Sequence, residues 1–195
     1  MTPHRPAANP FASHRIEGLS YRHGGSTLLD LGQRLEELGG RVAIVGPKGS
    51  GKTTLLEELA SALPEKPVKA RIPGSCPDPW RKVRTHLPQP VTHRHTVLVD
   101  GSEQLGAFGW RLLFHATRRA RYLIVTLHRP GRLPTLIECR TDAGLLRDLV
   151  PELVPADTAK LESAINDLFQ RHGGNIRSCF RELYDVYAGR ASFEL

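Results

Sequence analysis

Short apolar runs alternate with segments of helical spacing over residues 26–140. Runs such as RVAIV (41–45) are rich in β-branched residues, which is typical of strands buried on both faces. Five segments are predicted as strands: 41–45, 67–72, 96–100, 121–127 and 135–140. Helices are predicted between them, over 26–38, from Lys52 to before Pro64, and over 108–120. The alternation predicts an α/β fold with a parallel sheet of about five strands and right-handed crossovers.

The strand pattern ends at Thr141, and the remaining segments have only helical spacing. We therefore expect residues 142–195 to form a small C-terminal helical lid. The α/β core would then span residues 27–141.

Two segments contain too many breakers for long regular elements. Residues 1–26 hold six Pro and Gly residues and are predicted to form an irregular N-terminal arm, which could dock through Phe11 and Ile16. Residues 73–95 hold five prolines and are predicted to form a loop with one helical turn around Trp80.

The composition indicates a globular protein and adds little about chemistry. The chain has 195 residues, of which 39% are hydrophobic, enough for one domain with a buried core. Its three cysteines, Cys76, Cys139 and Cys179, are widely spaced, which suggests neither a disulfide framework nor a zinc site. No apolar run reaches the roughly 18 residues of a membrane span, and no signal-peptide pattern is present. We expect a cytoplasmic protein with no membrane partner.

The segment VGPKGSGKTTLL (45–56) matches the pattern G-x-x-x-x-G-K-[ST] between a predicted strand and a predicted helix. Its glycines would let backbone N–H groups turn inward around a phosphate, and the helix would add its positive dipole end. Lys52 would reach the β- and γ-phosphates, and the Thr53 hydroxyl would bind Mg²⁺. The segment therefore predicts a P-loop for ATP and Mg²⁺. Its nucleotide-binding residues would be Gly46, Pro47, Lys48, Gly49, Ser50, Gly51, Lys52, Thr53 and Thr54.

A magnesium site needs a second protein ligand, usually an acid at the end of a neighbouring strand. Asp100 closes the run TVLVD and fits this Walker B role. The alternative is an Asp-Gly hairpin turn, but the residues after Gly101 look helical rather than like a returning strand. Thr53 and Asp100 are therefore the predicted metal ligands.

These two motifs, a polar residue ending the strand 121–127, and GGNIR at the start of a C-terminal helix together resemble an AAA+ ATPase. The resemblance covers roughly residues 10–190 and is closest in layout to small AAA+ proteins that assist transposition, secretion and origin loading. It implies the three-layer sandwich of P-loop NTPases and ATP hydrolysis coupled to a macromolecular partner.

The resemblance also implies roles for individual residues. Thr126 or His128 would orient the attacking water, although either could simply be a strand end that meets solvent. Arg177 in the lid would contact the γ-phosphate, but it lies near Arg171 and Arg181 and could equally be a solvated charge.

The acid that AAA+ proteins commonly carry directly after the Walker B Asp is replaced here by Gly101. Glu103 could act instead as the base for the attacking water. It could equally be an acid favoured by the first turn of a helix. The replacement questions how efficiently ATP is hydrolysed, and a non-hydrolysing nucleotide-dependent switch is a competing hypothesis.

Other P-loop classes are tested by their own motifs. GTPase motifs are missing, and residues 54–99 contain no LSGGQ-like signature of transporter-type ATPases. A nucleotide or metabolite kinase is the alternative hypothesis, because HRPGR (128–132) could close over phosphates. In a kinase, Asp100 or Glu103 would activate an acceptor hydroxyl.

Positive charge is concentrated in the second half of the core. The chain has a net charge of +7, and no Asp or Glu occurs from residue 104 to 137. Six arginines lie in this stretch: Arg111, Arg118, Arg119, Arg121, Arg129 and Arg132. They could bind nucleic acid, act on the nucleotide of a neighbouring subunit in a homo-oligomer, or form a solvated face. His115 is predicted to share a core or boundary face with Phe108 and Leu112.

Overall fold

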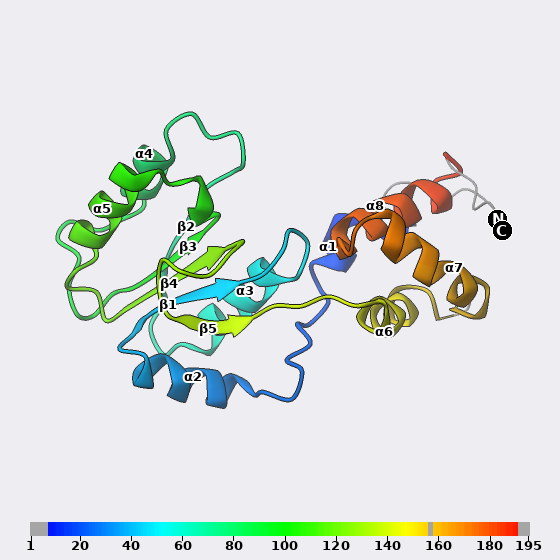
Figure 1. Cartoon of the computed structure of the whole chain (residues 1–195), viewed down its shortest axis with the longest axis horizontal. Coiled ribbons are helices and arrows are strands. Elements are labelled where there is room, and N and C mark those ends of the chain that lie inside the picture. The colour runs from blue at the N-terminus through cyan, green and yellow to red at the C-terminus, as the bar shows by residue number, and fades with distance from the viewer. Residues whose placement is uncertain (1–7, 156–157, 191–195) are drawn as a thin grey trace. The chain divides into compact units, whose positions relative to one another are not determined.

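The computed structural model describes residues 8–155 and 158–190, which form two compact units. The sheet unit contains residues 23–46 and 51–139. The helical unit contains the described residues of segments 1–22, 47–50 and 140–195. Figure 1 shows the strands of the first unit and the helices α6, α7 and α8 of the second.

Five strands form one parallel sheet, as the sequence pattern predicts. They are β1 (Arg41–Val45), β2 (Val68–Arg71), β3 (Thr96–Asp100), β4 (Tyr122–Leu127) and β5 (Thr135–Glu138). Their order in the sheet is β2-β3-β4-β1-β5. Because all neighbours are parallel, the carboxyl ends of β1, β3 and β4 lie at one edge of the sheet.

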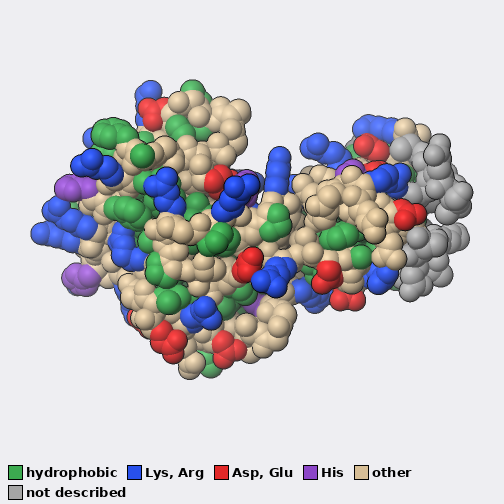
Figure 2. All heavy atoms as spheres, viewed as in Figure 1, with side chains coloured by type: hydrophobic (Ala, Val, Ile, Leu, Met, Phe, Trp, Pro, Cys, Tyr) green, Lys and Arg blue, Asp and Glu red, His purple; other side chains and the backbone are tan. Residues whose placement is uncertain are grey.

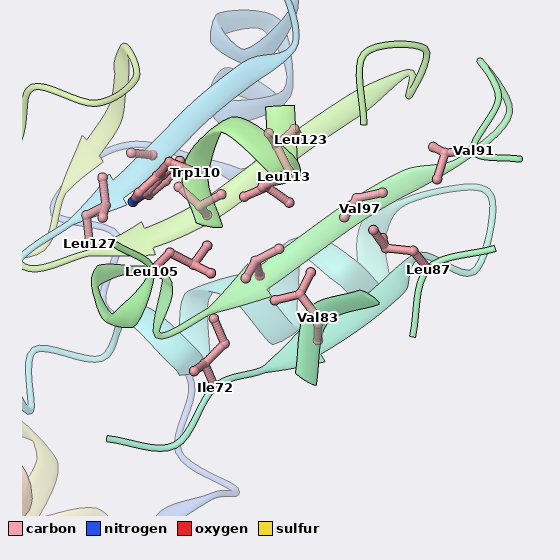
Figure 3. Close-up of a cluster of buried hydrophobic side chains, with 14 of the residues drawn as sticks. Ile72, Val83, Leu87, Val91, Val97, Leu105, Trp110, Leu113, Leu123 and Leu127 are labelled. Atoms are coloured by element: carbon pink, nitrogen blue, oxygen red, sulfur yellow. The ribbon is translucent and has the colours of Figure 1, made fainter. Parts of the chain in front are cut away.

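Helices cover both faces of this sheet and complete a three-layer α/β fold. The helices are α2 (Leu28–Glu37), α3 (Lys52–Ala62), α4 (Pro79–Arg84) and α5 (Ala107–Ala116). Helix α3 contacts β1, β3 and β4, and α2 contacts β5. On the other face, Val83 of α4 and Trp110 and Leu113 of α5 pack against Val97 and Leu123 of the strands (Figure 3). This dry packing fixes the strand ends on which the candidate site is built.

The helical unit has its own hydrophobic core. It contains α1 (Ser13–Ile16), α6 (Ala143–Leu153), α7 (Thr158–Arg171) and α8 (Ile176–Tyr187). Phe11 is only 2% exposed, and its ring lies 5.9 Å from that of Phe180 and 5.4 Å from that of Tyr187. Burial raises the pKa of Cys179 in the same core to about 11. The docking of Phe11 is thus confirmed, although the segment around it includes the short helix α1 and is not wholly irregular.

The predicted face of α5 is wrong. Trp110 and Leu113 are the buried residues of this helix, whereas Phe108 is 71% exposed and His115 is exposed. The apolar residues of α5 surround most of the helix, so spacing alone did not identify the buried side. His115 is therefore a surface residue.

No helix of the described chain is both long and apolar enough to cross a membrane.

Candidate nucleotide-binding site

The loop between β1 and α3 has the backbone geometry of a phosphate-binding loop. Gly49 and Gly51 both have a φ of 82°, in the left-handed region that residues with a Cβ rarely adopt. The Gly46 N–H donates to the Leu127 carbonyl at 3.1 Å, which ties the start of the loop to the end of β4. Gly51 is also the N-cap of α3, so the loop runs directly into the positive end of that helix.

Lys52 is held inside this loop. Its Nζ donates to the Gly46 carbonyl at 2.7 Å, and the residue is only 8% exposed. The first residue of α3 therefore reaches back to the first residue of the loop. A buried ammonium group is stable only with compensating acceptors, and a phosphate would supply them.

Asp100 is the centre of a hydrogen-bond network at the carboxyl ends of β3 and β4. Its Oδ2 accepts from Thr53 Oγ1 at 3.0 Å, and its Oδ1 accepts from Thr126 Oγ1 at 2.8 Å. Thr126 Oγ1 in turn accepts from the Gly101 N–H at 2.8 Å, and Ser102 Oγ donates to the Thr126 carbonyl at 2.6 Å. The structure thus brings the predicted metal ligands and the predicted Thr126 together.

The Thr53 hydroxyl and the Asp100 carboxylate fit a magnesium ion. Mg²⁺ takes oxygen ligands and commonly uses only one or two from the protein, with phosphate and water completing its shell. Among the described residues, no group of three or more His, Cys, Asp and Glu side chains could hold a metal. The oxygen pair at the loop is therefore suited to a metal that arrives with a phosphate.

Glu103 and His128 lie together beside this network. Glu103 is on the short 3-10 helix η2 (Ser102–Gln104), and its Oε1 lies 3.4 Å from Nε2 of His128, which follows β4. The other carboxylate oxygen, Oε2, is buried and has no hydrogen-bond partner among the described residues.

The backbone at position 101 leaves no room for an acidic side chain. Gly101 has a φ of 79°, and a Cβ there would lie 2.3 Å from the Ile72 carbonyl oxygen. A glutamate cannot occupy this position without moving the strand end. The substitution noted in the sequence is thus a consequence of how β3 ends against the residue after β2.

Sequence reasoning missed Arg71. This residue pairs with Asp100 across β2 and β3, and its Nε lies 3.6 Å from Asp100 Oδ2. A pocket of about 390 Å³ beside it is also lined by Lys69, Lys82 and His86. The sequence contains one indication of this contact: Arg71 and Asp100 both stand at or next to the ends of predicted strands, which turn out to be neighbours.

Arg177 lies on α8 of the helical unit, where its side chain is exposed. In that unit the loop tip 47–50 faces the start of α8, because a Cβ on Gly49 would fall 2.0 Å from Asn175 Oδ1 and 3.3 Å from the Arg177 backbone nitrogen. Asn175 caps α8 by accepting from the Ser178 N–H at 3.2 Å. No described contact assigns the Arg177 guanidinium group a partner.

The remaining loop residues have structural positions. Ser50 Oγ donates to the Pro47 carbonyl at 2.9 Å, which closes the tip of the loop. Lys48 is exposed, and Thr54 is half-buried in the first turn of α3.

The six arginines of residues 111–132 do not form one surface. Arg118, Arg119 and Arg121 precede β4, whereas Arg129 and Arg132 follow it. Six strand residues separate the two groups by about 20 Å, at roughly 3.3 Å per residue. Five of the six arginines thus form two groups at opposite ends of β4, and the sixth, Arg111, lies on α5.

Comparisons with known proteins agree with this loop geometry. The chain is 48% identical over 68 residues to the phosphonates import ATP-binding protein PhnC 1 of Pseudomonas savastanoi, a match that covers 34% of this chain and 25% of that protein. It is 38% identical over 165 residues to PhnC of Pseudomonas putida, covering 80% of this chain and 49% of that protein. It is 32% identical over 99 residues to the uncharacterized ABC transporter ATP-binding protein YvrA of Bacillus subtilis, covering 48% and 22%. No protein-family model matches the chain.

The structure has a P-loop-like α/β fold with a five-stranded parallel sheet. The relatives are named as phosphonates import or ABC transporter ATP-binding proteins, so the comparisons support a P-loop ATPase and not the narrower AAA+ resemblance. The chain spans about a quarter of the length of the first relatives it matches.

Proposed function

We propose that this chain binds ATP with Mg²⁺ at the loop of residues 46–54 and hydrolyses it. The observation that carries the proposal is the hydrogen bond between Thr53 and Asp100 at 3.0 Å, beside a buried Lys52. It joins the first turn of α3 to the end of β3, and these are the two places from which a P-loop protein holds the metal and phosphates.

Each group at the site would have one task. Lys52 would turn from the Gly46 carbonyl toward the β- and γ-phosphates, and Thr53 and Asp100 would hold the metal, whose charge stabilises the transferring phosphoryl group. Water would attack the γ-phosphorus, the bond to the β-phosphate oxygen would break, and Glu103 would accept the proton of the water. His128 would orient the carboxylate, and Thr126 would fix Asp100.

Within the P-loop ATPases, we propose that the chain has the AAA+ arrangement and couples ATP turnover to a macromolecular partner. Two features support the AAA+ arrangement. One is the polar Thr126 on β4, the strand between β1 and β3, and the other is the C-terminal helical unit that carries Arg177. The lack of an LSGGQ-like signature in residues 54–99 supports it over a transporter-type ATPase. We also propose a division into an N-terminal arm, a core and a lid, a cytoplasmic location and self-association.

Multiple-turnover phosphate release from ATP by the purified chain tests this function. Asp100→Asn would keep the fold and remove the metal-binding charge, so we expect release to fall by about 100-fold or more. Asp148→Asn, on the surface of α6, is the matched control and should leave release unchanged. Tight ATP binding without any turnover in the wild type would favour the non-hydrolysing switch.

A second candidate function is phosphoryl transfer to a small acceptor. The pocket of about 390 Å³ beside Asp100 is lined by two ion pairs, Lys69 with Glu57 and Arg71 with Asp100, and by Lys82, the cation that would meet an anionic acceptor. A phosphorylated small molecule in place of free phosphate, detected by mass spectrometry after incubation with ATP and cell metabolites, would decide for it.

A further inference from the structure

The loops at the amino-terminal end of the sheet form a surface rich in arginine, at the edge opposite the candidate nucleotide site. Two adjacent pockets of about 380 and 630 Å³ share Arg119 among their lining residues. Arg84 and Arg118 also line the first, and Arg94 lines the second. Figure 2 shows Arg, Lys and His side chains gathered along the left edge of the view, beside α5 in Figure 1. We call the surface formed by these two pockets and their four arginines, Arg84, Arg94, Arg118 and Arg119, the arginine face.

The charge of this face is not neutralised within the described chain. None of the pocket-lining residues is acidic. The sequence contains no Asp or Glu over residues 79–99 or 104–137, the two segments that supply the face. None of the four guanidinium groups forms an ion pair or hydrogen bond with a described residue. Arg121 is excluded from the face because it lies 4.0 Å from Glu36.

The backbone beneath the arginines is fixed. Buried Thr117 caps the carboxyl end of α5, and its carbonyl accepts from Arg41 at 3.0 Å. The Arg121 N–H donates to the His95 carbonyl at 2.9 Å, which joins the turn before β4 to the turn before β3. Within that second turn the Thr92 N–H donates to His95 Nδ1 at 2.9 Å. The arginines are thus presented from ordered turns, so that binding an anion would order little more than their side chains.

We propose that the arginine face binds the phosphate backbone of duplex DNA without reading its sequence. Several unpaired arginines on one surface match the repeated negative charge of a duplex. Trp80 is the only Trp, Tyr or Phe residue that lines the pockets, and it packs against the hydrophobic core, so the pockets lack the row of large rings on which single-stranded bases usually stack. This inference does not depend on ATP hydrolysis, since the face lies at the other end of the sheet.

The test is fluorescence anisotropy of a labelled mixed-sequence duplex, titrated with the full chain without nucleotide. Four phosphate contacts at about 0.9 released counterions each predict a slope of about −3.6 for log K against log[salt]. Arg118→Ala/Arg119→Ala should bind about tenfold or more weakly and roughly halve the slope. The control is Arg34→Ala/Arg129→Ala, which removes the same charge from exposed positions outside the face and should bind within about twofold of wild type.

Three results would overturn the proposal. The first is an equal loss of duplex affinity in both double variants, which would show that binding depends only on the net charge of the chain. The second is binding of the single strand more tightly than the duplex. The third is binding of polyglutamate as tight as that of the duplex at the same salt, which would assign the face to an acidic protein. Circular dichroism melting of each variant shows that the fold is kept, and Lys52→Ala should bind the duplex like wild type whatever its effect on ATP.

Discussion

At the scale of single residues, the proposed hydrolysis assigns the role of proton acceptor to Glu103. One of its carboxylate oxygens is buried without a hydrogen-bond partner in the described part of the chain, and the other lies 3.4 Å from Nε2 of His128. Replacing Glu103 with Gln keeps the shape and removes the proton acceptor. We expect phosphate release to fall by about 100-fold to 10,000-fold, the usual contribution of a general base, while ATP binding changes little. Glu58→Gln, on the far part of α3, serves as the comparison. Undiminished turnover in E103Q would remove Glu103 from the reaction.

Gly101 carries the second residue-scale prediction. A methyl group there would lie 2.3 Å from the Ile72 carbonyl at a φ of 79°. Gly101→Ala should therefore lower the free energy of unfolding by about 2 kcal/mol or more. Gly32 lies within α2, and a methyl group added to it would meet only open space, so Gly32→Ala should raise stability by about 0.5–1 kcal/mol. Urea denaturation separates the two, and equal effects of both substitutions would refute the backbone explanation.

At the scale of elements, the orientation of α5 distinguishes the structure from the sequence pattern. Leu113 is fully buried, whereas Phe108 is 71% exposed. Leu113→Ala should destabilise the sheet unit by about 2–5 kcal/mol. Phe108→Ala, which removes the larger side chain, should change stability by only about 0.5 kcal/mol. A larger loss for Phe108→Ala in thermal or urea unfolding would restore the face expected from spacing.

The elements also show what a sequence can predict here. The five strands and the helices around them follow from apolar periodicity, and Thr53, Asp100 and Thr126 meet because parallel strands end at one edge. The contacts of Arg71 with Asp100 and of Glu103 with His128 depend on register and on a short 3-10 turn, which periodicity does not encode. Arg94 lies on one face with Arg118 and Arg119 because of the way the proline-rich segment 73–95 folds. That segment has no repeating apolar pattern, so the sequence did not predict this face.

At the scale of the whole molecule, the proposed coupling assigns a role to the helical unit through Arg177. If its guanidinium group contacts the γ-phosphate, Arg177→Ala should reduce the rate of ATP turnover by about tenfold or more. Arg181→Ala, an exposed arginine one turn further along α8, should leave the rate within about twofold. Steady-state kinetics of both variants tests this, and equal rates would make Arg177 a solvated charge.

The central claim is that the loop of residues 46–54 grips the phosphates of ATP, with Lys52 as its cation. Isothermal titration of the full chain with ATP and Mg²⁺ tests it most directly. The account predicts one site per chain that is lost in Lys52→Ala, and weakened when Mg²⁺ is omitted. No heat of binding at millimolar ATP, or equal binding by Lys52→Ala, would contradict it.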